Sequence, residues 1–121
     1  MASIFEATAG KLIGPTTGGT VTQATSKATG VTLNTASGQI TLDNAALAAG
    51  AEVTFAVTNS EIAATDVVVV NHSSAGTAGA YLVQANTIAD GSFAITVANL
   101  SAGSFSEAIV LSFVALKGAS S

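Results

Sequence analysis

The chain has 121 residues, the size of one domain, and only 8% of them are charged, against roughly 25% in an ordinary soluble domain. Seven carboxylates and three lysines give a net charge of −4, so the basic patch needed for nucleic-acid binding is missing and adhesion to anionic membranes is disfavoured. The absence of cysteine excludes disulfides and thiolate-bound metals.

The first segment, residues 1–19, differs from the rest of the chain. Several glycines and Pro15 interrupt it and no regular period is visible, which predicts an extended N-terminal arm. This arm either frays in solution or becomes ordered on a neighbouring subunit. A basic start followed by an apolar run is missing, so we expect no signal peptide. The candidate partner contacts in the arm are its large apolar residues, Ile4, Phe5, Leu12 and Ile13.

From residue 20 to residue 118, apolar residues recur with a period of two, which is the spacing of half-buried strands. Ile95 and Val97, for example, alternate with Thr96 and Ala98. Strands are expected in the ranges 20–25, 31–34, 39–42, 53–58, 67–71, 80–85, 93–98 and 107–116. About eight short strands with regularly spaced turns predict an all-β domain over residues 20–118, an antiparallel β-sandwich of jelly-roll-like type.

Short polar segments between these strands predict turns. Residues 36–38 and the pair Asp90-Gly91 are typical of hairpin loops, and residues 71–79 are typical of an exposed loop. The one helical candidate runs from Asp43, a capping residue, to Gly50, a terminating residue. It would form a connector of one or two turns.

The faces of these strands that point away from the core carry alanine, threonine and serine in place of lysine and glutamate. Soluble sheets usually protect their outer faces and edges with charge, so this pattern favours coverage by other protein. The last strand, residues 107–116, is apolar on both faces and is therefore either central or covered by another chain. Its outer residues Val110, Val114 and Leu116 are the candidates for self-association in a homodimer or homotrimer. The alternative is a monomer with an uncharged surface.

Few side chains suit catalysis. His72, the single histidine, lies near Ser73, Ser74 and Asp66 in the sequence, but no nucleophile motif such as G-x-S-x-G accompanies them. The carboxylates fall near strand ends, where solvated acids are common, and no acidic loop of the EF-hand type occurs. We therefore expect no enzymatic activity, no catalytic residue, no cofactor and no metal site.

Three segments resemble small β modules of tailed-phage virion proteins. They are KATGVTLNTASGQITL at residues 27–42, VVVVNHSSAGTAGAYL at 67–82 and SFSEAIVLSFVALK at 104–117. Such modules occur alone, as capsid cement or decoration proteins, and as domains of phage fibres. The resemblance extends over residues 20–118 and implies a jelly-roll-like sandwich that binds the outside of an assembled major-capsid lattice between capsomers.

A free-standing cement protein is the leading hypothesis, because the chain starts with methionine and a short arm and no fibre shaft precedes it. The expected partners are further copies of the chain and the phage major capsid protein. The expected location is the capsid surface of the virion, after synthesis in the host cytoplasm. The alternative is a fibre or head-fibre tip whose loops, such as residues 71–79, bind a host-surface glycan or protein. A hydrolase acting on a surface glycan is the third hypothesis.

Overall fold

The computed structural model describes residues 18–118, and every regular element within them is a β-strand. Valine, isoleucine, threonine and phenylalanine favour extended backbone, and they alternate here with small residues. The expected all-β fold is confirmed, whereas the arm residues Ile4, Phe5, Leu12 and Ile13 lie outside the described residues. The eight strands are β1 (Gly19–Thr22), β2 (Val31–Thr32), β3 (Ser37–Thr41), β4 (Glu52–Thr58), β5 (Val67–Ser74), β6 (Tyr81–Ala89), β7 (Ser92–Asn99) and β8 (Val110–Leu116).

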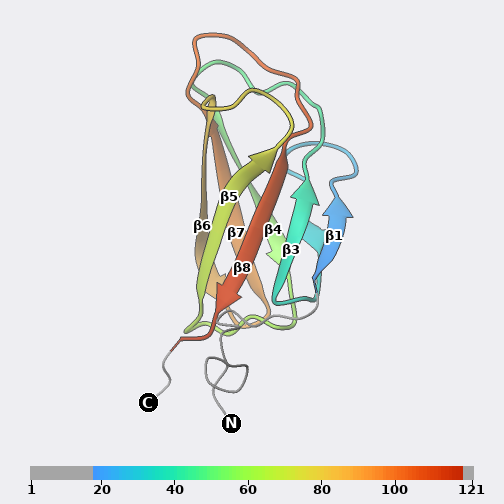
Figure 1. Cartoon of the computed structure of the whole chain (residues 1–121), viewed down its shortest axis with the longest axis vertical. Coiled ribbons are helices and arrows are strands. Elements are labelled where there is room, and N and C mark those ends of the chain that lie inside the picture. The colour runs from blue at the N-terminus through green and yellow to red at the C-terminus, as the bar shows by residue number, and fades with distance from the viewer. Residues whose placement is uncertain (1–17, 119–121) are drawn as a thin grey trace.

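The strands form two sheets that pack face to face as a β-sandwich (Figure 1). Sheet A has the order β1-β3-β8-β5, and sheet B has the order β2-β4-β7-β6. Four strand pairs are antiparallel, but β1 runs parallel to β3 and β2 runs parallel to β4. The expectation of wholly antiparallel sheets is therefore wrong at these two outer pairs, and the jelly-roll connectivity stays a prediction.

The core lies between the sheets and is built from every second residue of the strands. In β7, Phe93, Ile95 and Val97 are buried, while the residues between them are partly exposed. The Phe93 ring of sheet B packs against the Phe113 ring of sheet A, with 5.4 Å between their centroids. Burial of these side chains supplies the main driving force for folding.

The two hairpin predictions have different outcomes. β6 and β7 form the expected hairpin, with Gly91 at a φ of 84° in the turn. The hairpin expected at residues 36–38 is wrong, because Ser37 and Gly38 belong to β3 in sheet A, whereas β2 belongs to sheet B. The two sheets approach closely here, and a Cβ atom on Gly38 would lie 2.7 Å from Leu33 Cδ2.

The helix expected between Asp43 and Gly50 is also wrong. Asp43 Oδ1 accepts a hydrogen bond from Ala45 N at 2.8 Å, which holds a tight turn in place of a helix. Leu47 N then donates to Phe105 O at 2.8 Å, and Phe105 N donates to Leu47 O at 3.1 Å. This bridge between two distant loops buries Leu47 and replaces the local helical hydrogen bonds.

β8 occupies the centre of sheet A, between β3 and β5 (Figure 1). This position accounts for its two apolar faces: Leu111 and Phe113 point into the core, and Val110 and Val114 point outwards. Its neighbour β5 continues to Ser74, so the loop expected at residues 71–79 is shorter than predicted.

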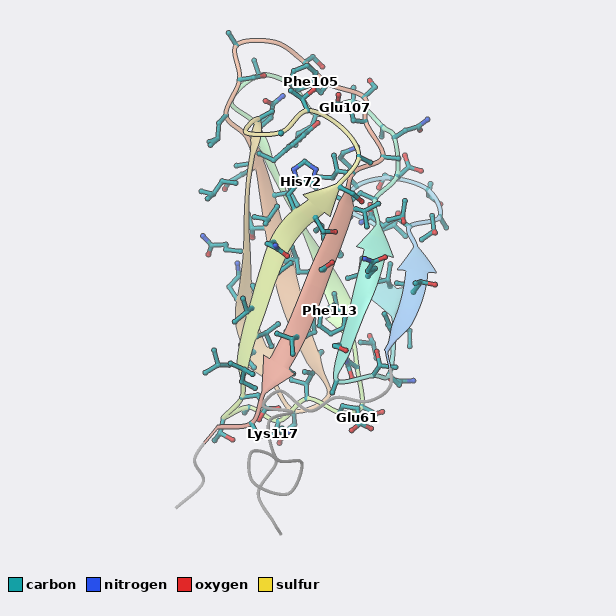
Figure 2. All side chains as sticks on the ribbon, viewed as in Figure 1. Glu61, His72, Phe105, Glu107, Phe113 and Lys117 are labelled. Atoms are coloured by element: carbon teal, nitrogen blue, oxygen red, sulfur yellow. The ribbon has the colours of Figure 1, made fainter. Side chains whose placement is uncertain are left out.

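The sandwich has two ends that differ in their residues (Figure 2). We call the end that carries Phe105 and Glu107 the upper end, and the end that carries Glu61 and Lys117 the lower end. At the lower end Lys117 Nζ donates to Glu61 O at 3.0 Å, which ties the end of β8 to the loop after β4.

Candidate functional site

The outer face of sheet A carries large apolar side chains that are exposed to solvent. Val67 is 56% exposed, Val69 is 50% exposed and Leu116 is 40% exposed. The register of β5 and β8 places Val69 beside Val114 and Val67 beside Leu116, so the four side chains are neighbours. We call these four residues the apolar patch. Because burial of apolar surface is favourable by about 25 cal/mol per Å², an exposed cluster of this kind is a candidate binding surface.

The rest of this face is small and neutral, and none of the outward-facing residues of β1, β3, β5 and β8 is charged. A shallow hollow of about 540 Å³ lies over β1, β3 and the adjoining part of β8, and its lining includes Gly18, Ser37 and Ser112. One half of the face therefore projects valines, and the other half is recessed. Besides the apolar patch, the outward-facing residues are Thr20, Thr22, Ser37, Gln39, Thr41, Asn71, Ser73, Val110 and Ser112.

The three predicted self-association residues all lie on this outer face. Val114 and Leu116 belong to the apolar patch, whereas Val110 lies nearer the upper end, paired with Thr41 and not with the patch. Val67 and Val69, the most exposed members of the patch, were not among the predicted self-association residues. The run of four valines from residue 67 marks these positions in the sequence. The run indicates an exposed apolar surface only once β5 is known to be an edge strand of sheet A.

The outer face of sheet B is also nearly uncharged, but its polar side chains bond to one another. The hydroxyl oxygens of Thr54 and Thr96 lie 2.8 Å apart, and Asn86 Nδ2 donates to Thr96 Oγ1 at 3.0 Å. Glu52 is the one charged residue among the outward-facing positions of β2, β4, β6 and β7. A single large apolar residue, Leu82, is exposed on these strands, at 53%. An exposed apolar cluster is thus a property of sheet A.

At the upper end, Glu107 fixes the loop that follows β5 (Figure 2). Glu107 Oε1 accepts hydrogen bonds from Tyr81 Oη at 2.7 Å and from Thr77 N at 3.0 Å, and Oε2 accepts one from Thr77 Oγ1 at 2.8 Å. These donors, the Tyr81 hydroxyl foremost, lower the pKa of Glu107. Burial, reinforced by the hydrogen bond to Glu107, raises the pKa of Tyr81. Tyr81 therefore stays protonated and Glu107 ionised, and the hydrogen bonds of Glu107 fix the loop after β5.

The residues considered for a hydrolytic triad do not come together. His72 Nε2 donates to Ala75 O at 2.6 Å, since a carbonyl oxygen only accepts, and the ring packs edge-on against Tyr81. Asp66 precedes β5 at the lower end, where it accepts a hydrogen bond from Lys117 Nζ at 2.7 Å. Six residues of extended strand, about 20 Å, separate Asp66 from His72.

Lys27 lies inside the upper end and not on the surface, with 3% of the residue exposed. Its Nζ donates to the backbone oxygens of Asp43, Ala45 and Glu107, the last two at 2.8 Å. Burial lowers the pKa of Lys27, and the nearby carboxylates of Asp43 and Glu107 oppose that shift. The ammonium group therefore joins separate loops, a role for which the sequence carries no local signal.

Metal-ligating side chains are dispersed over the described residues. Among residues 18–118, no three side chains of the types His, Asp and Glu come close enough to hold a metal ion together. In the same part of the chain, no helix has the length and apolar character needed to cross a membrane.

No protein-family model, no curated protein and no solved structure matches this chain. Its function is therefore inferred from its residues and their geometry.

Proposed function

We propose that this chain is a non-enzymatic structural protein of a tailed-phage virion, a capsid cement or decoration protein that binds the outside of the major-capsid lattice and stabilises the head. The observation that carries the proposal is the outer face of sheet A, where the apolar patch is exposed and no outward-facing strand residue is charged. Covering such a face with other protein lowers the free energy. The opposing cost of desolvating charged groups is small, because the face carries none.

The virion as partner is supported by the resemblance of residues 27–42, 67–82 and 104–117 to small β modules of phage particles. A cement protein stabilises a shell because it binds the assembled lattice more tightly than the separated subunits, so mass action favours the lattice. Many equivalent weak contacts on one shell act together through avidity. This role needs neither a cofactor nor a catalytic group.

The N-terminal arm is the proposed contact with the capsid, through Ile4, Phe5, Leu12 and Ile13. Deletion of residues 1–13 is expected to weaken retention on purified shells at least about tenfold, because contacts that repeat over a lattice are lost together. Thermal unfolding is expected to stay unchanged, since within the described residues 18–118 the first strand begins at Gly19. Cosedimentation with shells measures retention. Retention equal to that of the full chain contradicts the arm contact.

Electron microscopy of the virion tests the assignment itself. Density for this chain spread over the whole shell supports a cement protein. Density confined to the tail or to sparse protrusions contradicts it and favours a fibre module. Absence of the chain from the particle refutes both.

A second candidate function is a fibre or head-fibre tip that binds a host-surface glycan or protein. It is favoured by a hollow of about 250 Å³ at the upper end, which is lined by His72, Ser73 and Tyr81 together with the loop after β5. Aromatic rings beside small polar groups suit a sugar ring. Binding to a glycan array that the substitution Ala78→Trp abolishes, by filling this hollow, supports this candidate. No binding by the wild-type chain contradicts the glycan form of it.

A further inference from the structure

We propose that the outer face of sheet A packs against the same face of a second copy of this chain. The two copies are related by a two-fold axis that runs along the strands, between β3 and β8. The inference deepens the proposed function and rests on it for its setting, because it specifies how copies of a structural protein associate. Three observations carry it: side-chain size, charge and area.

Side-chain size changes steadily across one row of the sheet. From β5 to β3 the row contains Val69, Val114 and Ser37, and Gly18, the residue before β1, lies beside Ser37. A Cβ atom on Gly18 would lie 3.5 Å from Ser37 Oγ, so both residues point to the outer face, and the hollow of about 540 Å³ lies over them. The proposed axis places β5 opposite β1 and β8 opposite β3 at the same height. Val69 of each copy then fills the hollow over Gly18 of the other.

The neighbouring row has no trend in side-chain size, but all four of its side chains are polar and uncharged. From β5 to β1 it contains Asn71, Ser112, Gln39 and Thr20. The same rotation places Asn71 opposite Thr20 and Ser112 opposite Gln39, so hydrogen-bond donors meet acceptors. A two-fold interface requires a surface that is complementary to itself, and both rows meet this requirement.

Charge favours a second copy over a charged partner. Each chain carries a net charge of −4, so two copies repel one another wherever their carboxylates approach. The outward-facing strand residues of sheet A are uncharged, which lets two copies meet there without placing like charges together. The same face offers nothing to attract a basic or an acidic surface.

The area of the face is sufficient for a modest dimer. The four strands have 4, 5, 8 and 7 residues, so their mean length is six. At about 3.3 Å per residue and about 4.8 Å between strands they cover a flat footprint of about 380 Å² per copy. Protruding side chains increase the accessible surface above this footprint, so two copies together bury about 900 Å². That value lies below the range of stable interfaces and is typical of weak, reversible association. Aligned packing of two twisted sheets leaves their strands within about 30° of one another.

Sedimentation equilibrium of the full chain between about 1 and 100 µM tests the dimer. We expect a reversible dimer whose dissociation constant rises at least about 30-fold in Val69→Lys, because a charge replaces the central apolar contact. Leu82→Lys is the matched control, since Leu82 is 53% exposed on sheet B and Val69 is 50% exposed on sheet A. A monomer throughout this range overturns the proposal, and so does a dimer that resists Val69→Lys.

Cross-linking tests the two-fold axis independently. The chain has no cysteine, so only the introduced thiols can form a disulfide. In the double variant Gly18→Cys, Val69→Cys, the two thiols of one copy are three strands apart, about 14 Å, so a disulfide forms only between copies. We expect a covalent dimer on oxidation. The control pair Thr22→Cys, Val69→Cys, in which the first thiol is about 13 Å further along β1, is expected to stay monomeric. Equal cross-linking of both pairs, or none in either, overturns the axis.

Both measurements use the free chain without shells. A dimer that binds no shell refutes the proposed function and leaves this interface standing. A monomer that binds shells refutes the interface and leaves the proposed function standing.

Discussion

The upper end of the molecule and the outer face of sheet A use their side chains in opposite ways. At the upper end, Lys27, Asn99 and Glu107 are charged or polar, and each is bonded within the chain. On the outer face, Val67 and Val69 are apolar, and each is at least half exposed. Soluble domains usually show the reverse arrangement. The difference indicates that buried polar groups fix the loops of the upper end, while the apolar groups left outside the core are what the molecule presents to a partner.

Lys27→Met is expected to have the largest effect on the free energy of unfolding. It tests whether buried polar groups fix the loops of the upper end. The change leaves three backbone oxygens without their charged donor in a buried site, those of Asp43, Ala45 and Glu107. We expect the free energy of unfolding to fall by about 3 kcal/mol, measured by urea denaturation. Gln84→Met at an exposed position of β6 is the control and is expected to change it by less than about 0.5 kcal/mol. Equal stability of the two variants contradicts a structural role for Lys27.

Asn99→Ala gives the next largest effect. Asn99 is fully buried, and its Nδ2 donates to Leu47 O at 2.8 Å and to Gly103 O at 2.9 Å. Truncation removes both donors and leaves a small cavity, so we expect a loss of about 2 kcal/mol in the free energy of unfolding. Asn44→Ala, at an exposed position, serves as the comparison. A similar midpoint in urea for both alanine variants would show that this network contributes little.

The strands were predictable because alternation is a local property of the sequence, as the burial of Phe93, Ile95 and Val97 in β7 illustrates. Strand partners were predictable for the β6–β7 hairpin, where Asp90-Gly91 is a local turn signal, but not for strands that are distant in the sequence. Residues 36–38 have the composition of a hairpin loop, yet Ser37 pairs with Val114 because packing between distant segments decides the pairing. The expected helix failed for the same reason, since a long-range bridge outweighed local helical propensity.

The candidate site was predictable only in part. Val114 and Leu116 followed from the two apolar faces of the last strand, which are visible in the sequence. The exposure of Val67 and Val69 required the knowledge that β5 lies at the edge of sheet A. The burial of Lys27 had no local signal, because the oxygens that bind its ammonium group come from loops far away in the sequence.

Acidification tests the loop held by Glu107. The folded pKa of Glu107 lies below the usual value of 4.5, so its stabilising effect is fully present above pH 4.5 and is lost as the pH falls through the folded pKa. The variant Glu107→Gln keeps an acceptor for Tyr81 but does not titrate. We expect its melting temperature to fall less steeply than that of the wild type below pH 4.5. Parallel pH profiles of the two proteins contradict this assignment.

Val69→Lys is expected to have the smallest effect on the stability of the fold, because the outer face of sheet A serves association and not folding. Because Val69 is half exposed, we expect the change in the free energy of unfolding to stay below about 0.5 kcal/mol in dilute protein. The same substitution is expected to raise the dissociation constant of the dimer at least about 30-fold. A large loss of stability in the isolated chain would mean that the apolar patch serves the fold and not a partner.

We infer that the outer face of sheet A is covered by protein in the working assembly. The reactivity of a single thiol on this face tests that inference most directly. Val69→Cys introduces one cysteine into a chain that has none, and Leu100→Cys, at a position that is 62% exposed, provides the control. We expect maleimide labelling at Val69→Cys to slow several-fold as the protein is concentrated or bound to shells, while labelling at Leu100→Cys stays constant. Equal labelling rates at both positions that do not change with concentration or shell binding would show that the outer face of sheet A stays uncovered.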